Sequence, residues 1–477
     1  MVHALDRSDE SKGEHCEASM QRDVDVLVIG AGACGLAAAI AASDAGVGVA
    51  VIEKMDRPGG NSALSTGSVP AAATRFQREA GIVDSAEQFV ADLMRTGGPT
   101  DCPSLVRRLA ATSAETVEWL VDEVGARLTL VTAYKHVGHS VPRLHAPVSR
   151  RGKDLVDDLL TALAKRSIPL ALGNGARDLI VDANGVVGAD IETISGERQR
   201  ILADKIILAV NGFAGNRDLV ARFCPEISRA QYFGARGSTG EAVLWGNELG
   251  AALGNIGAYQ GYAAVSDPHG SLLSWTTIEK GGIIVNDAGD RFGDESAGYS
   301  GFTPNVMAQH GPCFAIFDQK IFDVTAAEEE FVELVNYGGV KKALTPAVLA
   351  AYHGLDPAAV AAAIEDYNKA ARGERADVLG RRDFALAPLA GTLYICRVVP
   401  GLFHTQGGLM VDDDGRVLRG DRRPIANLFA GGGAAAGLSG RTGAGGYASG
   451  NGLLSAIGLG RLAGIAAARE IESERAS

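Results

Sequence analysis

One segment near the N-terminus restricts the possible folds more than any other. Residues 23–30, DVDVLVIG, form a buried-strand pattern that leads through Gly30, Gly32 and Gly35 into a helix of small residues. Glu53 ends the next strand pattern, VGVAVIEK. In a G-x-G-x-x-G turn the glycines let the backbone approach a pyrophosphate at a helix N-terminus, and the acid accepts hydrogen bonds from ribose hydroxyls. Because strand, glycines, helix and acid occur together, the sequence predicts a βαβ unit that binds a dinucleotide.

The rest of the chain alternates strand and helix patterns until its texture changes. Helices are predicted at 113–125, 153–167 and 451–470, and a hairpin should turn at Asn184-Gly185. Between 240 and 393 continuous strands become rarer and loops more frequent, which indicates an inserted domain. We therefore predict an α/β fold with these parts: a disordered tail at 1–22, a Rossmann-type nucleotide-binding domain at 23–239 and 394–477, and an α+β cap domain at 240–393.

Charge and cysteine content narrow the choice of partner and compartment. The formal net charge is −12 over 477 residues and there is no basic run, so neither nucleic acid nor an anionic membrane is expected as a partner. The six cysteines show no metal-ligand spacing, which predicts no metal site, no disulfides and a reducing, cytoplasmic setting. Residues 1–22 lack the apolar core of a secretion signal. A small molecule is therefore the expected partner.

The segment after the βαβ unit identifies the nucleotide through a resemblance. PGGNSALSTGS, at 58–68, resembles the segment that passes the flavin in FAD proteins of the fumarate reductase and succinate dehydrogenase flavoprotein superfamily. The resemblance continues in LAVNGFAGN (208–216), GGIIVNDAGDRFGDES (281–296), HTQGGLMVDDDG (404–415) and the glycine-rich C-terminal part. It implies FAD as the cofactor. Membrane-bound members attach the flavin to a histidine in the first segment, and since 58–68 contains none, the FAD is expected to be non-covalent.

Carried over position by position, the resemblance implies contacts to the cofactor along most of the chain. The residues are Gly30, Gly32, Ala33, Gly35, Glu53, Lys54, Gly60, Asn61, Ser62, Thr66, Gly67, Ala176, Asn211, Gly433, Asn451, Leu453 and Leu454. Gly433 stands where the dicarboxylate reductases have a glutamate. The helix that begins near Asn451 should direct its N-terminus at the flavin, where its partial positive charge stabilises an anionic reduced ring.

The catalytic positions depart from those of the fumarate reductases. Two arginines that act on the dicarboxylate in that group are replaced by Tyr299, in ESAGY, and Tyr447, in GYASG. Neutral hydroxyls thus replace permanent cations that suit carboxylates. The two motifs resemble the ring-ketone desaturases, namely the 3-ketosteroid Δ4-(5α)-dehydrogenases and 4-oxocyclohexanecarboxylate dehydrogenases. This resemblance implies a catalytic set of Tyr299, Tyr447 and Ser449.

These residue types suit the desaturation of a ketone. Removing an α-proton and a β-hydride requires hydroxyl donors on the carbonyl oxygen, a hydroxyl relay for the proton, and a flavin for the hydride. The sequence therefore predicts an FAD-dependent oxidoreductase that acts on a cyclic ketone, with an electron acceptor that the sequence does not identify.

Two alternatives stay open at this stage. His404 matches a histidine that dicarboxylate reductases use on a substrate carboxylate, which favours a reductase of a small unsaturated acid. His139 and Arg143, in YKHVGHSVPRLH, resemble a loop near the flavin and are weaker candidates for substrate binding. The second alternative is a flavin-binding electron carrier without an organic substrate, which would leave the hydroxyl set without a purpose.

Overall fold

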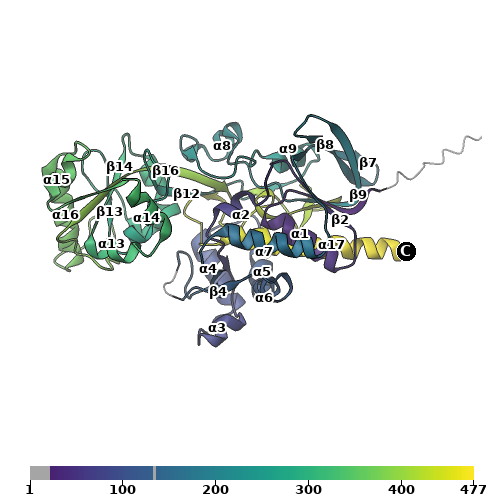
Figure 1. Cartoon of the computed structure of the whole chain (residues 1–477), viewed down its shortest axis with the longest axis horizontal. Helices are drawn as coiled ribbons and strands as arrows, with labels where there is room; N and C mark the ends of the chain where they lie inside the picture. The colour runs from purple at the N-terminus through teal and green to yellow at the C-terminus, as the bar shows by residue number, and fades with distance from the viewer. Residues whose placement is uncertain (1–21, 133–135) are drawn as a thin grey trace, which may run out of the picture.

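The computed structural model describes residues 22–132 and 136–477, and its strands gather mainly in two large sheets (Figure 1). The tail predicted to be disordered, except its last residue, and Cys16 lie outside the described residues. The elements β13, β14 and α13–α16 form one lobe of the molecule, at the left of Figure 1, and β2, β7–β9, α1 and α17 form another. The predicted α/β class is confirmed.

The first sheet has eight strands, in the order β18-β19-β9-β1-β2-β6, with β7 and β8 continuing from β9. Its strands are β1 (Val24–Ile29), β2 (Val49–Glu53), β6 (Leu170–Leu172), β7 (Asn174–Asp182), β8 (Gly185–Thr193), β9 (Arg198–Leu208), β18 (Arg416–Leu418) and β19 (Pro424–Ala430). Strand β1 pairs in parallel with β2 and β9, as the predicted βαβ unit requires. Asp182 pairs with Gly185, so the hairpin is confirmed, but it turns at Ala183 and Asn184, one residue before the predicted Asn184-Gly185.

Helices α1 (Ala33–Asp44) and α17 (Asn451–Ala476) pack against each other at backbone distance. A Cβ atom at Gly460 would lie 2.3 Å from the carbonyl oxygen of Cys34, and one at Gly464 would lie 2.3 Å from that of Ala38. Glycine is therefore required at this crossing. Helix α17 runs past its predicted end at 470. By length and composition α17 could span a membrane. Because 83% of its most apolar window is buried inside the fold, its apolar composition is that of a core helix.

The second sheet has seven strands, in the order β13-β14-β16-β12-β20, with β10 and β15 also paired to β16. Its strands are β10 (Gln231–Tyr232), β12 (Gly257–Ser266), β13 (Ile283–Val285), β14 (Cys313–Asp318), β15 (Val340–Ala343), β16 (Leu393–Thr405) and β20 (Thr442–Gly443). Strand β16 crosses the boundary expected at 393/394 without a break, and β10 and β20 come from outside 240–393. The second sheet thus extends beyond the predicted cap limits, and the limits themselves stay a prediction.

Helices surround this second sheet in the part of the chain expected to form the cap. They are α10 (Thr276–Glu279), α11 (Gly298–Gly301), α12 (Thr303–Met307), α13 (Gln319–Thr325), α14 (Glu329–Asn336), α15 (Pro346–Ala351) and α16 (Pro357–Ala371). A short 3-10 turn at Glu295–Ala297 precedes α11. The long strands β12 and β16 leave this lobe toward the nucleotide-binding lobe (Figure 1). They pair Gln260 with His404, so cap-side strands carry side chains to the junction.

The remaining elements complete the nucleotide-binding lobe. They are α2 (Gly60–Leu64), α3 (Arg75–Glu79), α4 (Ala86–Gly97), α5 (Pro103–Ala111), α6 (Ser113–Trp119), α7 (Gly152–Lys165), α8 (Arg217–Phe223), α9 (Glu241–Glu248), β3 (Val69–Pro70), β4 (Leu128–Leu130), β5 (Leu144–Pro147), β11 (Leu253–Gly254) and β17 (Gly408–Leu409). A π-helical turn at Leu120–Val124 and 3-10 turns at Pro225–Ile227 and Gly432–Ala434 are also present. The helix predicted over 113–125 is confirmed, with a π-helical last turn.

Candidate active site

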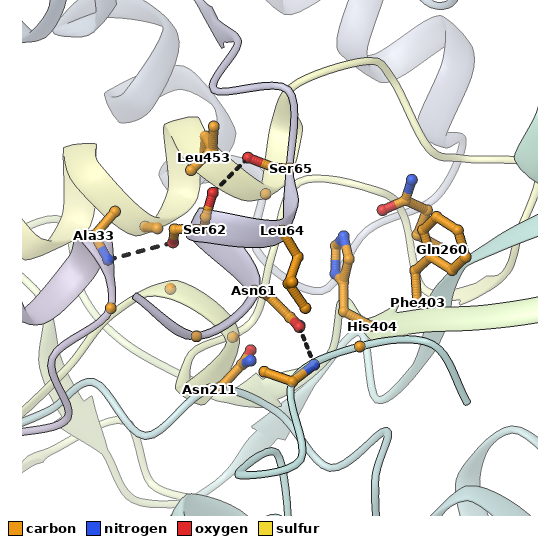
Figure 2. Close-up of a pocket in the computed structure, with 18 of the residues that line it drawn as sticks. Ala33, Asn61, Ser62, Leu64, Ser65, Asn211, Gln260, Phe403, His404 and Leu453 are labelled. Atoms are coloured by element: carbon orange, nitrogen blue, oxygen red, sulfur yellow. Dashed lines mark hydrogen bonds between the residues drawn. The ribbon is translucent and has the colours of Figure 1, made fainter. Parts of the chain in front are cut away.

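A single cavity of about 700 Å³ is lined by residues of both lobes. Its volume lies within the range of cofactor and small-molecule sites. Most of the residues predicted to bind the cofactor line it: Gly30, Gly32, Ala33, Glu53, Lys54, Gly60, Asn61, Ser62, Thr66, Ala176, Asn211, Gly433 and Leu453. Figure 2 shows Ala33 and Ser62 on one side of this pocket and His404, Phe403 and Gln260 on the other.

Four predicted cofactor residues do not line the cavity, and their contacts stay a prediction: Gly35, Gly67, Asn451 and Leu454. A Cβ atom at Gly35 would lie 1.8 Å from the carbonyl oxygen of Gly30, so this glycine lets α1 pack against the turn. Asn451 is fully buried, and its Nδ2 donates to Ser439 Oγ at 3.4 Å. These residues support the cavity wall from behind rather than facing its contents.

The glycine turn and the following acid are held in a geometry that leaves room for a nucleotide. Gly30 has a φ of +110°, and a Cβ atom there would lie 2.4 Å from the carbonyl oxygen of Ala209. Glu53 Oε2 accepts from the N–H of Ala31 at 2.9 Å, and Oε1 accepts from that of Met55 at 2.9 Å. Each carboxylate oxygen keeps a lone pair for a further hydrogen bond, so Glu53 can still accept from a ribose hydroxyl.

Buried polar atoms along the cavity wall test whether a nucleotide cofactor fits. Asn61 Nδ2, Glu241 Oε2 and Ser455 Oγ are buried without a hydrogen-bond partner, and all three residues line the cavity. Asn61 Oδ1 accepts from the N–H of Ala235 at 2.6 Å, as Figure 2 shows, which fixes the side chain. Buried polar groups normally have partners. A bound molecule rich in donors and acceptors, such as FAD, would supply them.

The three predicted catalytic residues come together in the cavity. Tyr299 lies on α11, and Tyr447 and Ser449 lie in the loop before α17. The hydroxyls of Tyr299 and Ser449 are 3.3 Å apart, and the rings of the two tyrosines have centroids 5.9 Å apart. Burial raises the pKa of Tyr447 to about 12. Burial, with a contribution from Tyr447, raises the pKa of Tyr299 well above its usual value, so both phenols are neutral hydrogen-bond donors.

His404, at the end of β16, also faces the cavity (Figure 2). Its ring centroid lies 5.9 Å from that of Tyr447, and its Nδ1 is 3.0 Å from Gln406 Nε2. Gln406 Oε1 accepts from Ser439 Oγ at 2.9 Å, so a chain of hydrogen bonds holds the imidazole. Burial lowers the pKa of His404 to about 4. The imidazole is therefore uncharged near neutral pH and does not offer a cation to a carboxylate.

The expectation that His139 and Arg143 contact substrate is corrected by the structure, because neither residue lines the cavity. The guanidinium of Arg143 is fully buried and binds Asp84 at 2.7 Å and Asp92 at 2.5 Å. His139 Nε2 is 2.8 Å from the backbone oxygen of Ser449. Both side chains thus stand behind the catalytic loop. From the same histidine-rich segment, His136 lines the cavity instead, and its spacing alone did not distinguish it.

The comparisons with known proteins agree with this geometry. The model of the family described as FAD binding domain matches residues 25–452. The chain belongs to this FAD-binding family.

Relatives of this flavoprotein act on carbon–carbon bonds. It is 31% identical over 453 residues to the NADH:fumarate oxidoreductase of Klebsiella pneumoniae, covering 94% of the chain and 48% of that protein. The chain thus spans about half the length of this relative. The solved open conformation of a flavocytochrome c3 fumarate reductase is similar with a TM-score of 0.80 and 29% identity, over 95% of this chain and 79% of that one.

A second similar solved structure is that of a ketosteroid dehydrogenase. The 3-ketosteroid-Δ4-(5α)-dehydrogenase of Rhodococcus jostii RHA1, in complex with 4-androstene-3,17-dione, is similar with a TM-score of 0.75 and 26% identity, over 95% of this chain and 99% of that one. The predicted superfamily and FAD are confirmed, and the flavoprotein is an oxidoreductase of CH–CH groups. Non-covalent attachment stays a prediction from the lack of histidine in 58–68.

The end of the cavity formed by the cap-side elements was not predicted from the sequence of this flavoprotein. That end carries aromatic side chains and carboxylates: Phe233, Tyr262, Trp275, Phe403, Glu279, Glu328, Glu330 and Glu333. The rings of Tyr262 and Phe403 stack with centroids 5.3 Å apart, and the Tyr262 ring lies 5.3 Å from that of Tyr299. The acidic run at 328–330 was the one sequence signal for this wall, but nothing in it distinguishes a cavity wall from a solvated helix start.

Proposed function

We propose that this flavoprotein desaturates a cyclic ketone between its α and β carbons. A 3-oxosteroid or a 4-oxocyclohexanecarboxylate represents the substrate class. The observation that carries the proposal is the convergence of Tyr299, Tyr447 and Ser449 in one cavity, with the two tyrosines at positions where the dicarboxylate reductases carry arginines. The similarity to a solved ketosteroid dehydrogenase supports the same substrate class.

The carbonyl oxygen would be bound by Tyr447 and the start of α17. Burial raises the Tyr447 pKa, while contacts to the Tyr299 hydroxyl and to the backbone N–H of Gly450 lower it by smaller amounts. A neutral phenol beside a backbone N–H at a helix N-terminus is a pair of fixed donors for an oxygen that gains negative charge. This pair would polarise the ketone and make its α-hydrogen more acidic.

The proton and the hydride would leave in different directions. FAD, when bound, supplies a hydride acceptor for the β-carbon. The α-proton would pass to the hydroxyls of Ser449 and Tyr299, whose oxygens are 3.3 Å apart, and on to solvent. Because the high pKa of Tyr299 disfavours a lasting phenolate, the pair acts as a relay rather than as a stored base. In the reverse direction the same neutral hydroxyl would donate the proton to an enone.

A reductase of a small unsaturated acid is the second candidate. It is favoured by His404 in the cavity and by the similarity to fumarate reductases. The cations that line the cavity among the described residues are Lys54, Arg57 and Arg150. The ammonium of Lys54 is already bound by Glu241 and by Thr239 Oγ1. The hydroxyl set therefore favours the ketone.

Anaerobic mixing with a substrate panel tests the proposal. A 3-oxosteroid or a 4-oxocyclohexane acid should bleach the flavin absorbance, while succinate should not. Bleaching by succinate, or reoxidation of the reduced protein by fumarate alone, would support the acid reductase and contradict the ketone proposal.

We further propose a reducing, cytoplasmic location. The cysteines among the described residues, Cys34, Cys102, Cys224, Cys313 and Cys396, are all free and buried, as is usual where thiols stay reduced. Mass spectrometry of the freshly isolated protein under alkylating conditions would test this proposal, since a disulfide involving any of them would contradict it.

A further inference from the structure

The cap end of the cavity has a chemistry of its own, supplied by two elements. Helix α10 and the residues just before it contribute Ser274, Trp275 and Glu279, and the start of α14 contributes Glu328 and Glu330. Thr276 Oγ1 donates to Glu328 Oε1 at 2.6 Å, and Ser274 Oγ donates to the other oxygen of this carboxylate. These bonds tie the two elements together and leave the other acids of the wall facing the cavity.

Three carboxylates of this wall have no partner within the described part of the chain. No hydrogen bond or ion pair is found to the side chains of Glu279, Glu330 or Glu333 among residues 22–132 and 136–477, although all three line the cavity. Desolvation by the surrounding protein, partly offset by the neighbouring cation Lys280 and reinforced by Glu328, raises the pKa of Glu279 to about 7. Desolvation, again with Glu328, raises that of Glu330. All three side chains are exposed and line the cavity, so they can present negative charge to a ligand bound there.

Trp275 provides an independent sign of a ligand at the same place. The residue is 4% exposed, it lines the cavity, and its indole N–H is buried without an acceptor. A buried donor without a partner is costly. A ligand group that accepts from Trp275 and donates to a neighbouring carboxylate would satisfy both sides of this wall.

The acidic wall lies close enough to the catalytic hydroxyls to act on the same ligand. Tyr262 lies between the two regions, with its ring centroid 5.3 Å from that of Tyr299, tilted, and 6.3 Å from that of Trp275, edge to face. The charge of Glu279 is among the smaller causes that raise the pKa of Tyr299. A molecule whose ketone lies at Tyr447 and Tyr299 therefore extends along Tyr262 toward the acids.

We propose that this wall selects a ketone whose far end carries an uncharged alcohol or amide group, and that it rejects ketones with a carboxylate there. An alcohol or amide both donates to a carboxylate and accepts from the indole, whereas a carboxylate only accepts and is repelled by the glutamates. This inference rests on the proposed ketone chemistry and narrows its substrate class.

The test uses pairs of ligands that match in shape and differ in charge. The first pair is 4-oxocyclohexanecarboxamide and 4-oxocyclohexanecarboxylate, and the second is a 3-oxosteroid with a carboxamide or a carboxylate at its far end. Affinity for the FAD-loaded protein is read from the change in the flavin spectrum. In at least one pair the amide should bind about tenfold more tightly than the acid at low salt, as expected for like charges several ångströms apart, and added salt should narrow this difference.

Variants assign the difference to the wall. In the double variant Glu279→Gln/Glu330→Gln, the affinity for the acid should come within about threefold of the affinity for the amide, because most of the repulsion is removed. The matched control is Glu329→Gln. Glu329 is the chain neighbour of Glu330, pairs with Arg151 at 3.6 Å and does not line the cavity, so the difference in affinity should persist. Trp275→Phe should weaken binding of the amide and leave binding of unsubstituted cyclohexanone unchanged.

The outcomes separate this inference from the proposed function. Equal or tighter binding of the acid, no spectral change with either amide, or an unchanged difference in the double variant would overturn the inference. Tighter binding of the amide than of the acid, without bleaching of the flavin, would support the selectivity of the wall. The same result would contradict only the proposed desaturation of a ketone.

Discussion

The two ends of the cavity are built on different physical principles. At the nucleotide end the backbone defines the shape: a Cβ atom at Gly30 would meet the carbonyl oxygen of Ala209 at 2.4 Å. At the cap end side chains define it, with the rings of Tyr262 and Phe403 stacked beside the carboxylate of Glu279. A backbone-defined site tolerates few substitutions and serves one ligand. A side-chain-defined site can change its ligand through single replacements, as Tyr299 and Tyr447 illustrate.

The largest effect is expected at the backbone-defined end. Gly30→Ala should abolish stable FAD binding, lowering the bound FAD by more than about tenfold, because the residue has a positive φ and no room for a Cβ atom. The FAD-to-protein ratio after gel filtration measures this. Gly46→Ala is the matched control, since Gly46 also has a positive φ, of +89°, but nothing lies within 4 Å of its Cβ position. Equal FAD content in both variants would contradict the steric argument.

The second effect should leave the nucleotide end intact. Tyr447→Phe and Ser449→Ala should each lower the rate of flavin reduction by a ketone at least about tenfold, the scale of lost acid–base catalysis, while FAD stays bound. Stopped-flow absorbance with bound FAD measured in parallel separates the two properties. Tyr337→Phe is the control, because Tyr337 is 68% exposed and does not line the cavity. Near-normal rates in both variants would remove the catalytic assignment.

The same contrast explains what the sequence could predict. Gly30, Gly32 and Glu53 were identifiable because a backbone turn against a nucleotide requires particular residues at fixed spacing. Tyr299 and Tyr447 were identified only through the resemblance, because 147 residues lie between them in the chain and only the fold brings their rings to 5.9 Å. The acids of the cap wall had no such signal. Glu279 and Glu330 line one cavity because Glu328, just before α14, is bonded to Ser274 and Thr276 at the start of α10, and an exposed helix would show the same letters.

Arg143 shows why spacing misled the sequence interpretation. Its place among histidines favoured substrate binding, but tertiary contacts pair it with Asp84 and Asp92. Arg143→Met would leave the buried Asp84 carboxylate without a cation and Asp92 with Arg95 alone, at 2.6 Å, which should cost about 3 kcal/mol of unfolding free energy. Urea denaturation measures the loss. The control is Arg127→Met, because the Arg127 side chain is 77% exposed and pairs with Asp158 at 2.8 Å. Little change in the unfolding free energy is expected for this variant. Equal stability of the two variants would contradict a buried ion pair behind the site.

The smallest effect is a pH dependence of stability that has opposite signs for three buried histidines and for Glu279. Burial lowers the pKa of His139, His145 and His404 to about 4 each, so between about pH 4 and 6.5 the unfolded chain binds more protons than the folded one. Stability should therefore fall as the pH falls through this window, by at most about 1.4 kcal/mol per pH unit for each imidazole.

Glu279 should oppose this loss, because its pKa is raised to about 7 in the folded protein and the folded state then holds the extra proton. Its contribution to stability is unfavourable above pH 7 and disappears as the pH falls toward about 4.5. The loss of stability between pH 7 and 5 should consequently be steeper in Glu279→Gln than in the parent and shallower in His145→Asn. Urea denaturation at several pH values measures the three slopes. Identical slopes would contradict the pKa shifts of both His145 and Glu279. The electrostatic contrast between the buried histidines and the acidic cap end would then be removed.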